Sequence, residues 1–432
     1  MKNEDRKIVD VKLWGSLVGK LAVDDHGIGY FKYAPEFLDK NIEPSPMYMP
    51  VKNKVVYSFP KLNKATFKGL PGMIADSLPD AYGDRLLDIH FEKEGIQKKA
   101  NIELLKLCYM SSKATGALEY APPLSDRNKE NHELSINALM HVVDKLIGSK
   151  QQLKEGDLNN IQDIISIGSS LGGAAPKAVI DIDFESNSIR PGNLQNPENY
   201  ESWIIKFDTL KNPYELNDHQ SSGFGSVEYV YYLMVREAGI NMTPSKLYQD
   251  SGRSHFMTKR FDRLKGEKIH MQTLHGIAHM DSYAPHDYNT YFRVLSHLKL
   301  NHAEHEELYR RIVFNGLSAN TDTHTKNTSF LMNREGKWSI SPCYDLICTV
   351  SMRNNIERHK TLINGKTHDF TRKDFIQVAK EAGIKLSKAT EIIEEVSTSL
   401  SRWQALATEN NVRRKHIDHV KKLIDKNLKL LL

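Results

Sequence analysis

The sequence predicts an α+β fold of two lobes, preceded by a β-rich N-terminal subdomain. Three observations support this. Alternating apolar runs open the chain, strand-forming runs recur between 178 and 261, and helical periodicity dominates after residue 262. At 432 residues, with 40% hydrophobic and 26% charged residues, the chain is long enough for two or three cores. We expect an N-terminal subdomain at 1–125, a mixed lobe at 134–262 and a helical lobe at 263–432.

The first region begins with short strands between Ile8 and Tyr57, where apolar and polar residues alternate and glycines punctuate the runs. A helical stretch follows at Gly72–Glu94. Prolines mixed with charged residues at Pro122–Glu133 are typical of an exposed connection, so we place the first boundary there.

The middle region alternates helices with strands. Apolar residues at helical spacing predict a helix at Leu134–Ile147 and another at Ser226–Ala238. Strands are predicted at Ala178–Ile182, Trp203–Phe207 and Phe256–Phe261.

The last region is predicted to be mostly helical, with one strand-like segment at Thr328–Met332. Helical periodicity predicts helices at Tyr288–Leu298, Glu304–Leu317, Arg372–Ala382, Leu386–Ala405 and Arg414–Leu431. The final helix carries a basic run that starts at Arg413. A solvated face is its first interpretation, and contact with an acidic partner or nucleic acid is the alternative.

Composition narrows the class of protein. The net charge of +5 predicts solubility more than a nucleic-acid surface. Cys108, Cys343 and Cys348 are odd in number and lack zinc-site spacing, which fits a reducing cytoplasm. The charged N-terminal segment lacks a following apolar stretch, and no apolar run approaches the roughly 18 residues of a membrane span. We therefore expect a cytoplasmic protein that neither is secreted nor spans a membrane.

The most informative segment runs from Asn320 to Asn327, followed later by Asp345. Asp322 is followed five residues later by Asn327, and Asp345 lies in an apolar-flanked turn. In protein kinases an aspartate accepts the proton of the substrate hydroxyl, while an asparagine and a later aspartate hold magnesium. The Asp–Asn spacing alone occurs by chance in many chains, so the interpretation depends on the segments around it.

Two basic residues lie inside the same loop. His324 is open to three interpretations, a ligand, a base or a structural histidine that holds the loop, and the last is favoured by sequence alone. Lys326 either approaches a transferred phosphate or is an ordinary exposed lysine.

A Gly-rich segment at Gly168–Lys177 precedes a predicted strand. Glycines and small side chains let backbone amides approach a phosphate closely, although an ordinary turn is an equally open interpretation. The candidate nucleotide contacts here are Ser169, Ser170, Leu171, Gly172 and Gly173.

Lys206 interrupts an apolar strand, and Glu228 on the next predicted helix could orient it through an ion pair. This is where a kinase carries its phosphate-binding lysine, and a solvated lysine is the alternative. The junction of the two lobes falls at Lys259–Arg263, which makes the main chain of Lys259 and Phe261 a candidate for adenine binding, and a strand end with solvated charges is the alternative.

Taken together, these segments resemble the HipA-type serine/threonine kinases, toxins of bacterial type II toxin–antitoxin modules. The resemblance is carried by Leu78–Asp80, Gly116–Tyr120, the Gly-rich segment with Lys177, Lys259–Arg263, Asn320–Asn327 and Ser341–Leu346. It implies a two-lobed, kinase-like, HipA-like fold that uses ATP and Mg²⁺.

The resemblance also implies roles for single residues. Asp322 would be the catalytic base, Asn327 and Asp345 would hold magnesium, and Lys206 would contact phosphate. Lys259 to Phe261 would form the adenine hinge, with Asp262 near the ribose. Ser170 would be the autophosphorylated serine that inactivates the enzyme, with Ser169 as the neighbouring alternative.

The implied partners are a helix-turn-helix antitoxin of HipB type, operator DNA contacted mainly through that antitoxin, and a translation protein as substrate, such as an aminoacyl-tRNA synthetase. Two alternatives stay open from the sequence. One is a catalytically weak kinase-fold co-repressor that binds its antitoxin on operator DNA, and the other is a small-molecule kinase.

Overall fold

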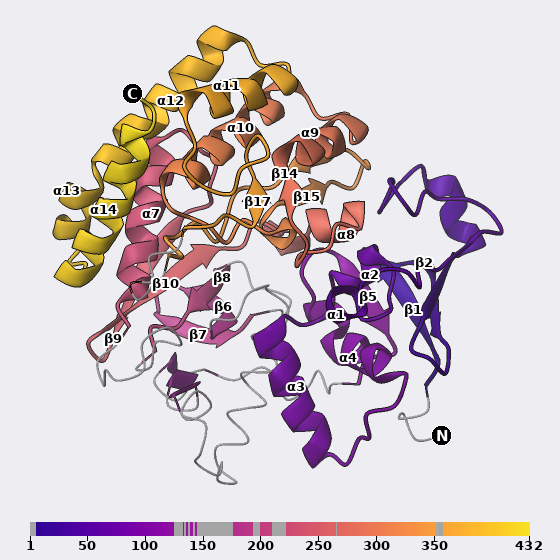
Figure 1. The fold of residues 1–432 in the computed structure, drawn as a ribbon. Helices are drawn as coiled ribbons and strands as arrows, with labels where there is room; N and C mark the ends of the chain where they lie inside the picture. The colour runs from indigo at the N-terminus through magenta and orange to yellow at the C-terminus, as the bar shows by residue number, and fades with distance from the viewer. Residues whose placement is uncertain are drawn as a thin grey trace.

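The computed structural model describes residues 6–124, 176–192, 199–209, 222–264, 266–350 and 357–432, together with residue 352 and single positions between 133 and 144. Figure 1 shows the N-terminal strands on one side of the molecule, a second sheet below, and the C-terminal helices above it. This arrangement confirms the predicted α+β class with a β-rich N-terminal part and a helical C-terminal part. None of the described helices is long and apolar enough to cross a membrane.

The N-terminal sheet has the strand order β4-β3-β2-β1-β5, and every pairing in it is antiparallel. Its strands confirm the short alternating runs: β1 (Ile8–Leu13), β2 (Ser16–Val23), β3 (Gly29–Tyr33), β4 (Val56–Tyr57) and β5 (Leu118–Ala121). A short 3-10 helix, η2 (Pro35–Lys40), follows β3, and another, η3 (Ser111–Lys113), precedes β5.

The helices of this region correct one prediction. The stretch Gly72–Glu94 is not one helix but two, α2 (Gly72–Ala75) and α3 (Ala81–Lys93). The helix is interrupted in the segment that contains Pro79. The Asp80 carboxylate then caps the N-terminus of α3 by accepting a hydrogen bond from Gly83 N at 2.7 Å. Two further helices, α1 (Lys64–Phe67) and α4 (Ile102–Met110), were not predicted.

The second sheet has the order β7-β6-β8-β10-β9. It confirms the three strands predicted for the middle region, as β6 (Lys177–Asp183), β8 (Glu201–Lys206) and β10 (Arg253–Lys259). Two further strands, β7 (Ser188–Pro191) and β9 (Ser245–Asp250), were not predicted. Helix α7 (Phe224–Glu237) packs on β10 and β9. The predicted helix at Leu134–Ile147 lies largely outside the described residues.

The region after residue 262 is less purely helical than predicted. A three-stranded sheet, β13-β15-β16, is built from His270–Thr273, Ser329–Met332 and Trp338–Ile340. Two separate two-stranded sheets are also present, β11 (Arg263–Leu264) with β12 (Glu267–Lys268), and β14 (His286–Asp287) with β17 (Thr361–Leu362). Strand β15 confirms the strand-like segment predicted at Thr328–Met332. The other strands of this region have only two to four residues, too few to give a clear period in sequence.

The helices of this region are α8 (Leu274–Ala278), α9 (Tyr288–His297), α10 (His302–Leu317), α11 (Arg372–Glu381), α12 (Leu386–Ser401), α13 (Trp403–Glu409) and α14 (Arg414–Lys429), and the 3-10 turn η5 (Thr325–Asn327) lies between α10 and β15. The single helix predicted at Leu386–Ala405 is therefore wrong, because the chain turns at Arg402 and starts a second helix.

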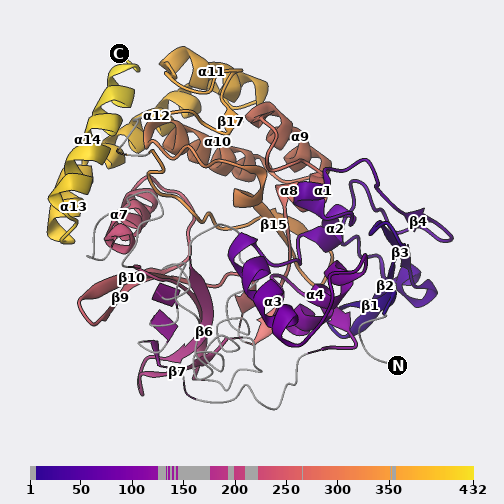
Figure 2. The same cartoon turned by 60° about the horizontal axis from the view of Figure 1, so that its bottom comes forward.

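Two hydrophobic cores hold these parts together. The larger joins the N-terminal sheet to the C-terminal helices. The smaller packs α3 and α4 against the second sheet, and it includes Leu87, Leu105, Ile180 and Trp203. Figure 2 shows α3 and α4 between the N-terminal sheet and β6. The N-terminal part is thus integrated with the second sheet through shared apolar packing.

Candidate functional site

The centre of the site is Lys206, the last residue of β8. Its ammonium lies 2.5 Å from Glu228 Oε1 on α7 and also hydrogen-bonds the Asp345 carboxylate. Three segments far apart in sequence therefore meet at one amine. Asp345 reaches it from a left-handed backbone conformation, with a φ of 54°, which is unfavourable for a non-glycine residue and is often found at functional sites.

Burial and charge act against each other in this group. Burial disfavours the charged amine of Lys206, but the carboxylates of Asp345 and Glu228 outweigh it and raise its pKa. Burial also works against ionisation of Asp345, yet Lys206 and Lys177 keep its pKa below the ordinary value. For Glu228, burial outweighs the attraction of Lys206 and raises the pKa. Asp345 thus stays ionised, as a metal-binding carboxylate must be.

The loop that carries Asp322 lies beside this group, between α10 and β15. Asn327 Nδ2 donates a hydrogen bond to the main-chain oxygen of Asp322 at 2.8 Å, which closes the loop across the predicted five-residue spacing. His324 Nε2 lies 3.8 Å from Asp322 Oδ1. Burial lowers the pKa of His324, so this ring is neutral near pH 7.

Hydrogen bonds connect the Asp322 loop to the Asp345 segment. Tyr344 Oη donates to the Lys326 main-chain oxygen at 2.7 Å, and Thr321 N donates to Thr349 Oγ1 at 2.9 Å. Asn320 Nδ2 lies 3.5 Å from the Asp345 main-chain oxygen. The two segments that carry the predicted metal ligands are therefore held side by side by several hydrogen bonds.

A pocket opens next to these residues. Its wall brings together several predicted residues from both lobes: Lys206, Lys259, Phe261, Asp262, Lys326 and Asp345. Asp322, His324 and Asn327 lie in the adjacent loop and do not line the pocket. Ser169, Ser170, Leu171, Gly172 and Gly173 lie outside the described residues, and Lys177 at the end of that segment is in the wall.

The donor set fits magnesium better than a transition metal. The described residues hold no group of three or more His, Cys, Asp or Glu side chains that could bind a metal by themselves. Mg²⁺ is usually held by one or two protein carboxylates together with substrate phosphates. The Asp345 carboxylate and the Asn327 amide oxygen are hard oxygen donors of this kind.

The junction between the sheets favours Phe261 over Lys259 as an adenine contact. Lys259 N donates to Pro244 O at 2.9 Å, and the Lys259 carbonyl accepts from Thr243 Oγ1 at 2.8 Å. Among the described residues, the Phe261 main chain forms no hydrogen bond. Of the two residues expected to contact adenine, Phe261 is therefore the one whose main-chain groups are available to do so.

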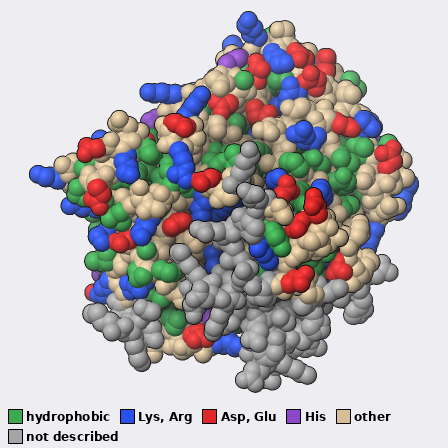
Figure 3. Space-filling model, turned by 180° about the vertical axis from the view of Figure 1, so that it is seen from behind, with side chains coloured by type: hydrophobic (Ala, Val, Ile, Leu, Met, Phe, Trp, Pro, Cys, Tyr) green, Lys and Arg blue, Asp and Glu red, His purple; other side chains and the backbone are tan. Residues whose placement is uncertain are grey.

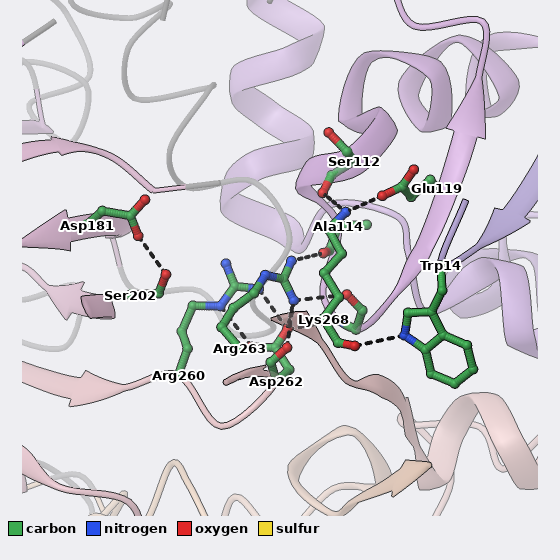
Figure 4. A network of polar contacts seen from close by, with 11 residues as sticks. Trp14, Ser112, Ala114, Glu119, Asp181, Ser202, Arg260, Asp262, Arg263 and Lys268 are labelled. Carbon is green, nitrogen blue, oxygen red and sulfur yellow. Dashed lines mark hydrogen bonds and ion pairs between the residues drawn. The ribbon is translucent and has the colours of Figure 1, made fainter. Parts of the chain in front are cut away.

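Asp262 is engaged by protein groups on both carboxylate oxygens. Arg260 Nε donates to Oδ1 at 2.8 Å, while Arg263 and the Gly116 N–H donate to Oδ2, each at 2.8 Å. Figure 4 shows these side chains converging between the junction and the N-terminal part. Although burial raises the carboxyl's pKa, the two guanidiniums outweigh it and hold the pKa well below its ordinary value. This geometry favours an anchor that joins the two parts over the ribose contact expected from the sequence.

Sequence reasoning missed two carboxylates of the pocket wall, both from the N-terminal part. Asp80 pairs with Lys177 at 2.8 Å, and both side chains are almost fully buried. Asp76 accepts hydrogen bonds from Thr273 N at 2.6 Å and from Thr273 Oγ1 at 2.7 Å. The signal was the pair of acidic residues on either side of Leu78–Pro79, of which Asp80 contributed to the family resemblance and Asp76 did not.

Comparison with known proteins agrees with this picture. Residues 169–403 match the model of the HipA-like C-terminal domain, and residues 9–121 match that of the HipA N-terminal domain. A protein of Haemophilus influenzae named as a kinase is 24% identical over 238 residues, which are 47% of this chain and 69% of that protein. The kinase-named Y4dM of Sinorhizobium fredii is 29% identical over 164 residues, 34% of this chain and 38% of the relative.

A solved structure extends the likeness to the whole fold. HipA of Shewanella oneidensis MR-1, determined with HipB and operator DNA, aligns with a TM-score of 0.66 at 14% identity, covering 98% of this chain and 96% of that one. At this identity the match shows the fold. The two domain matches span most of the sequence, and they show that this kinase-fold chain belongs to the HipA family.

Proposed function

We propose that the chain is an ATP-dependent protein serine/threonine kinase that acts as the toxin of a toxin–antitoxin module. The observation that carries the proposal is Lys206, which joins Glu228 and Asp345 in the pocket wall beside the Asp322 loop. Protein kinases position nucleotide phosphates with a lysine–glutamate pair and a nearby metal-binding aspartate.

Each group has a role that follows from its position. Asp322 accepts the proton of the substrate hydroxyl, Lys206 orients the phosphates, and Asn327 and Asp345 would hold Mg²⁺. When bound, ATP supplies the transferred phosphoryl group, and Mg²⁺ neutralises charge on its oxygens. His324 is neutral near pH 7 and lies 3.8 Å from Asp322, which suits the support of the loop rather than phosphate binding.

Regulation and substrate extend the same proposal. Ser170, with Ser169 as the alternative, would be the autophosphorylated residue. Roughly two added negative charges would repel nucleotide phosphates from that loop. A translation protein such as an aminoacyl-tRNA synthetase is the proposed substrate, supported by family membership alone. Because translation proteins work in the cytoplasm, a cytoplasmic location of the chain is part of the same proposal.

The proposed partner is a helix-turn-helix antitoxin of HipB type, with operator DNA contacted mainly through it. The support is the Shewanella oneidensis HipA structure, which contains HipB and operator DNA. Figure 3 shows the molecule from behind, and the described acidic and basic side chains on this face are interspersed rather than gathered into one basic surface.

The same solved complex favours a second candidate function, a catalytically weak co-repressor that grips its antitoxin on DNA. Basic residues of α14, including Lys421 and Lys422, would then add salt-dependent DNA affinity. Charge reversal of these two lysines separates the candidates. The co-repressor requires weaker operator binding by the chain–antitoxin complex, and the kinase does not.

Intact-mass analysis tests the main proposal. Wild type and Asp322→Asn are incubated with ATP and magnesium, and phosphopeptides are mapped. We expect one phosphate on Ser170 in wild type and none in the variant, because the amide cannot accept the hydroxyl proton. Phosphate on neither protein, or on both, would contradict the proposal.

A further inference from the structure

The segment 357–363 runs alongside the Asp322 loop and is attached to it by main-chain and side-chain hydrogen bonds. Lys360 N donates to Thr321 O at 3.0 Å, and Thr361 N donates to Thr323 Oγ1 at 3.1 Å. Thr361 Oγ1 also donates to the Thr323 main-chain oxygen, and Tyr291 Oη lies 2.9 Å from the same hydroxyl. Thr323 and Thr361 are buried. The backbone of Lys360 is therefore held in a fixed register beside the proposed base.

The Lys360 side chain reaches Asp322 from this position. Its ammonium lies 2.5 Å from Asp322 Oδ1, closer than His324 Nε2 at 3.8 Å. Oδ1 is shielded from solvent, yet it accepts no hydrogen bond of proper geometry from the described residues. Lys360 thus lies against the Asp322 oxygen that would receive the proton of the substrate hydroxyl. The contact is an ion pair without a well-aligned hydrogen bond.

Among the described residues, Lys360 is the basic side chain that contacts the Asp322 carboxylate most closely, while Lys326 of the same loop lies in the pocket wall. Lys206 already contacts two carboxylates, and burial keeps His324 neutral near pH 7. The side chains of Lys360 and Asp322 are 52% and 41% exposed. Exposed ion pairs contribute little to stability, so a substrate hydroxyl can displace this contact easily.

We propose that Lys360 is a further catalytic residue that moves from Asp322 to the phosphoryl group during transfer. The inference rests on the proposed kinase function. The substrate hydroxyl replaces Lys360 at Oδ1 and gives its proton to Asp322. Its oxygen forms the new bond to phosphorus, and the bond from phosphorus to the nucleoside diphosphate breaks, leaving the electron pair on the diphosphate oxygen. Lys360 stays protonated and faces the phosphoryl oxygens, where a fixed positive charge stabilises the transition state.

The test compares Lys360→Gln and Lys360→Arg with wild type and with Lys20→Gln as a matched control. Lys20 pairs with Asp10 at 2.7 Å with similar exposure, 62% and 36%, but it lies in the N-terminal sheet. Initial rates of phosphate incorporation are measured across ATP concentrations. Thermal melting of each purified variant is recorded alongside.

We expect Lys360→Gln to lower the maximal rate about 100-fold, with the KM for ATP within about twofold of wild type, as for loss of a group that acts in the transition state. Lys360→Arg should recover at least a tenth of the wild-type rate, and Lys20→Gln should match wild type. The melting temperatures of Lys360→Gln and wild type should agree.

A wild-type or faster rate in Lys360→Gln would overturn the inference, since the contact would then be dispensable or inhibitory. A loss confined to KM, or an equal loss in the arginine variant, would also overturn it. Failure of wild type to incorporate phosphate is a separate result that removes the kinase proposal itself.

Discussion

Asp76 shows how burial sets the protonation of a single group in the pocket wall. Its carboxylate accepts two hydrogen bonds from Thr273, and Lys326 attracts it, yet burial dominates and raises its pKa to about 6. A folded-state pKa above the ordinary value of 3.8 means that the protonated form is favoured on folding. The stability from this group is therefore present at low pH and is lost as the pH rises through 6.

Asp76→Asn removes this titration while keeping a side chain of similar shape. Between pH 5 and pH 7.5, the free energy of unfolding of wild type should fall relative to the variant by on the order of 1 kcal/mol, from linkage. Urea unfolding of both proteins at the two pH values measures the difference. A constant difference between the proteins at the two pH values would contradict the raised pKa.

At the scale of elements, α10 leads into the loop that carries Asp322. Its first turn has a capping box in which Asn301 Oδ1 accepts from Glu304 N at 3.2 Å and Glu304 Oε2 accepts from Asn301 N at 3.1 Å. The helix ends at Leu317, five residues before Asp322. The capping box at the start of this helix thus contributes to the placement of Asp322, the proposed base, which follows the end of the helix.

Asn301→Ala removes the side-chain acceptor at the start of α10. The free energy of unfolding should fall by about 1 kcal/mol, while Asn301→Asp, which keeps the acceptor, should stay near wild type. Chemical denaturation of the three proteins measures this. Equal losses in the alanine and aspartate variants would mean that the cap contributes nothing through hydrogen bonding.

Long helices, in which the amphipathic pattern repeats over several turns, were predictable from the sequence, whereas most short helices and strands were not. The bounds of α10 and α7 fall within two residues of their predictions, because each has several turns of amphipathic pattern. The break at Pro79–Asp80 was missed because apolar spacing continues across it. In the site, Asp322, Asn327 and Asp345 were candidates because kinase chemistry dictates their types and order. The contacts of Lys177 with Asp80 and of Lys360 with Asp322 depend on tertiary pairing, which no local pattern encodes.

At the scale of the whole molecule, the N-terminal part is attached to the kinase fold by polar contacts as well as apolar packing. Lys268 contacts Glu119 and the Ser112 main-chain oxygen, each at 2.6 Å, and Trp14 Nε1 donates to Lys268 O at 2.8 Å. Burial lowers the pKa of Lys268 to about 8, which reflects how enclosed this contact is. A pocket with walls from both parts requires such attachment, because relative motion would change its shape.

The buried pair of Asp80 and Lys177 is the strongest test of this coupling, because it joins α3 to β6 directly beside the pocket. Asp80→Asn removes a carboxylate that compensates a buried lysine, so the free energy of unfolding should fall by about 3 kcal/mol. Adding Lys177→Met should restore much of this loss, since an apolar side chain needs no charge partner there.

Asp10→Asn, which breaks the exposed pair with Lys20, is the matched control and should cost about 1 kcal/mol or less. Urea unfolding of the four proteins measures these differences. Equal losses in the exposed and buried variants, or no recovery in the double variant, would show that the charge pair does not couple the two parts.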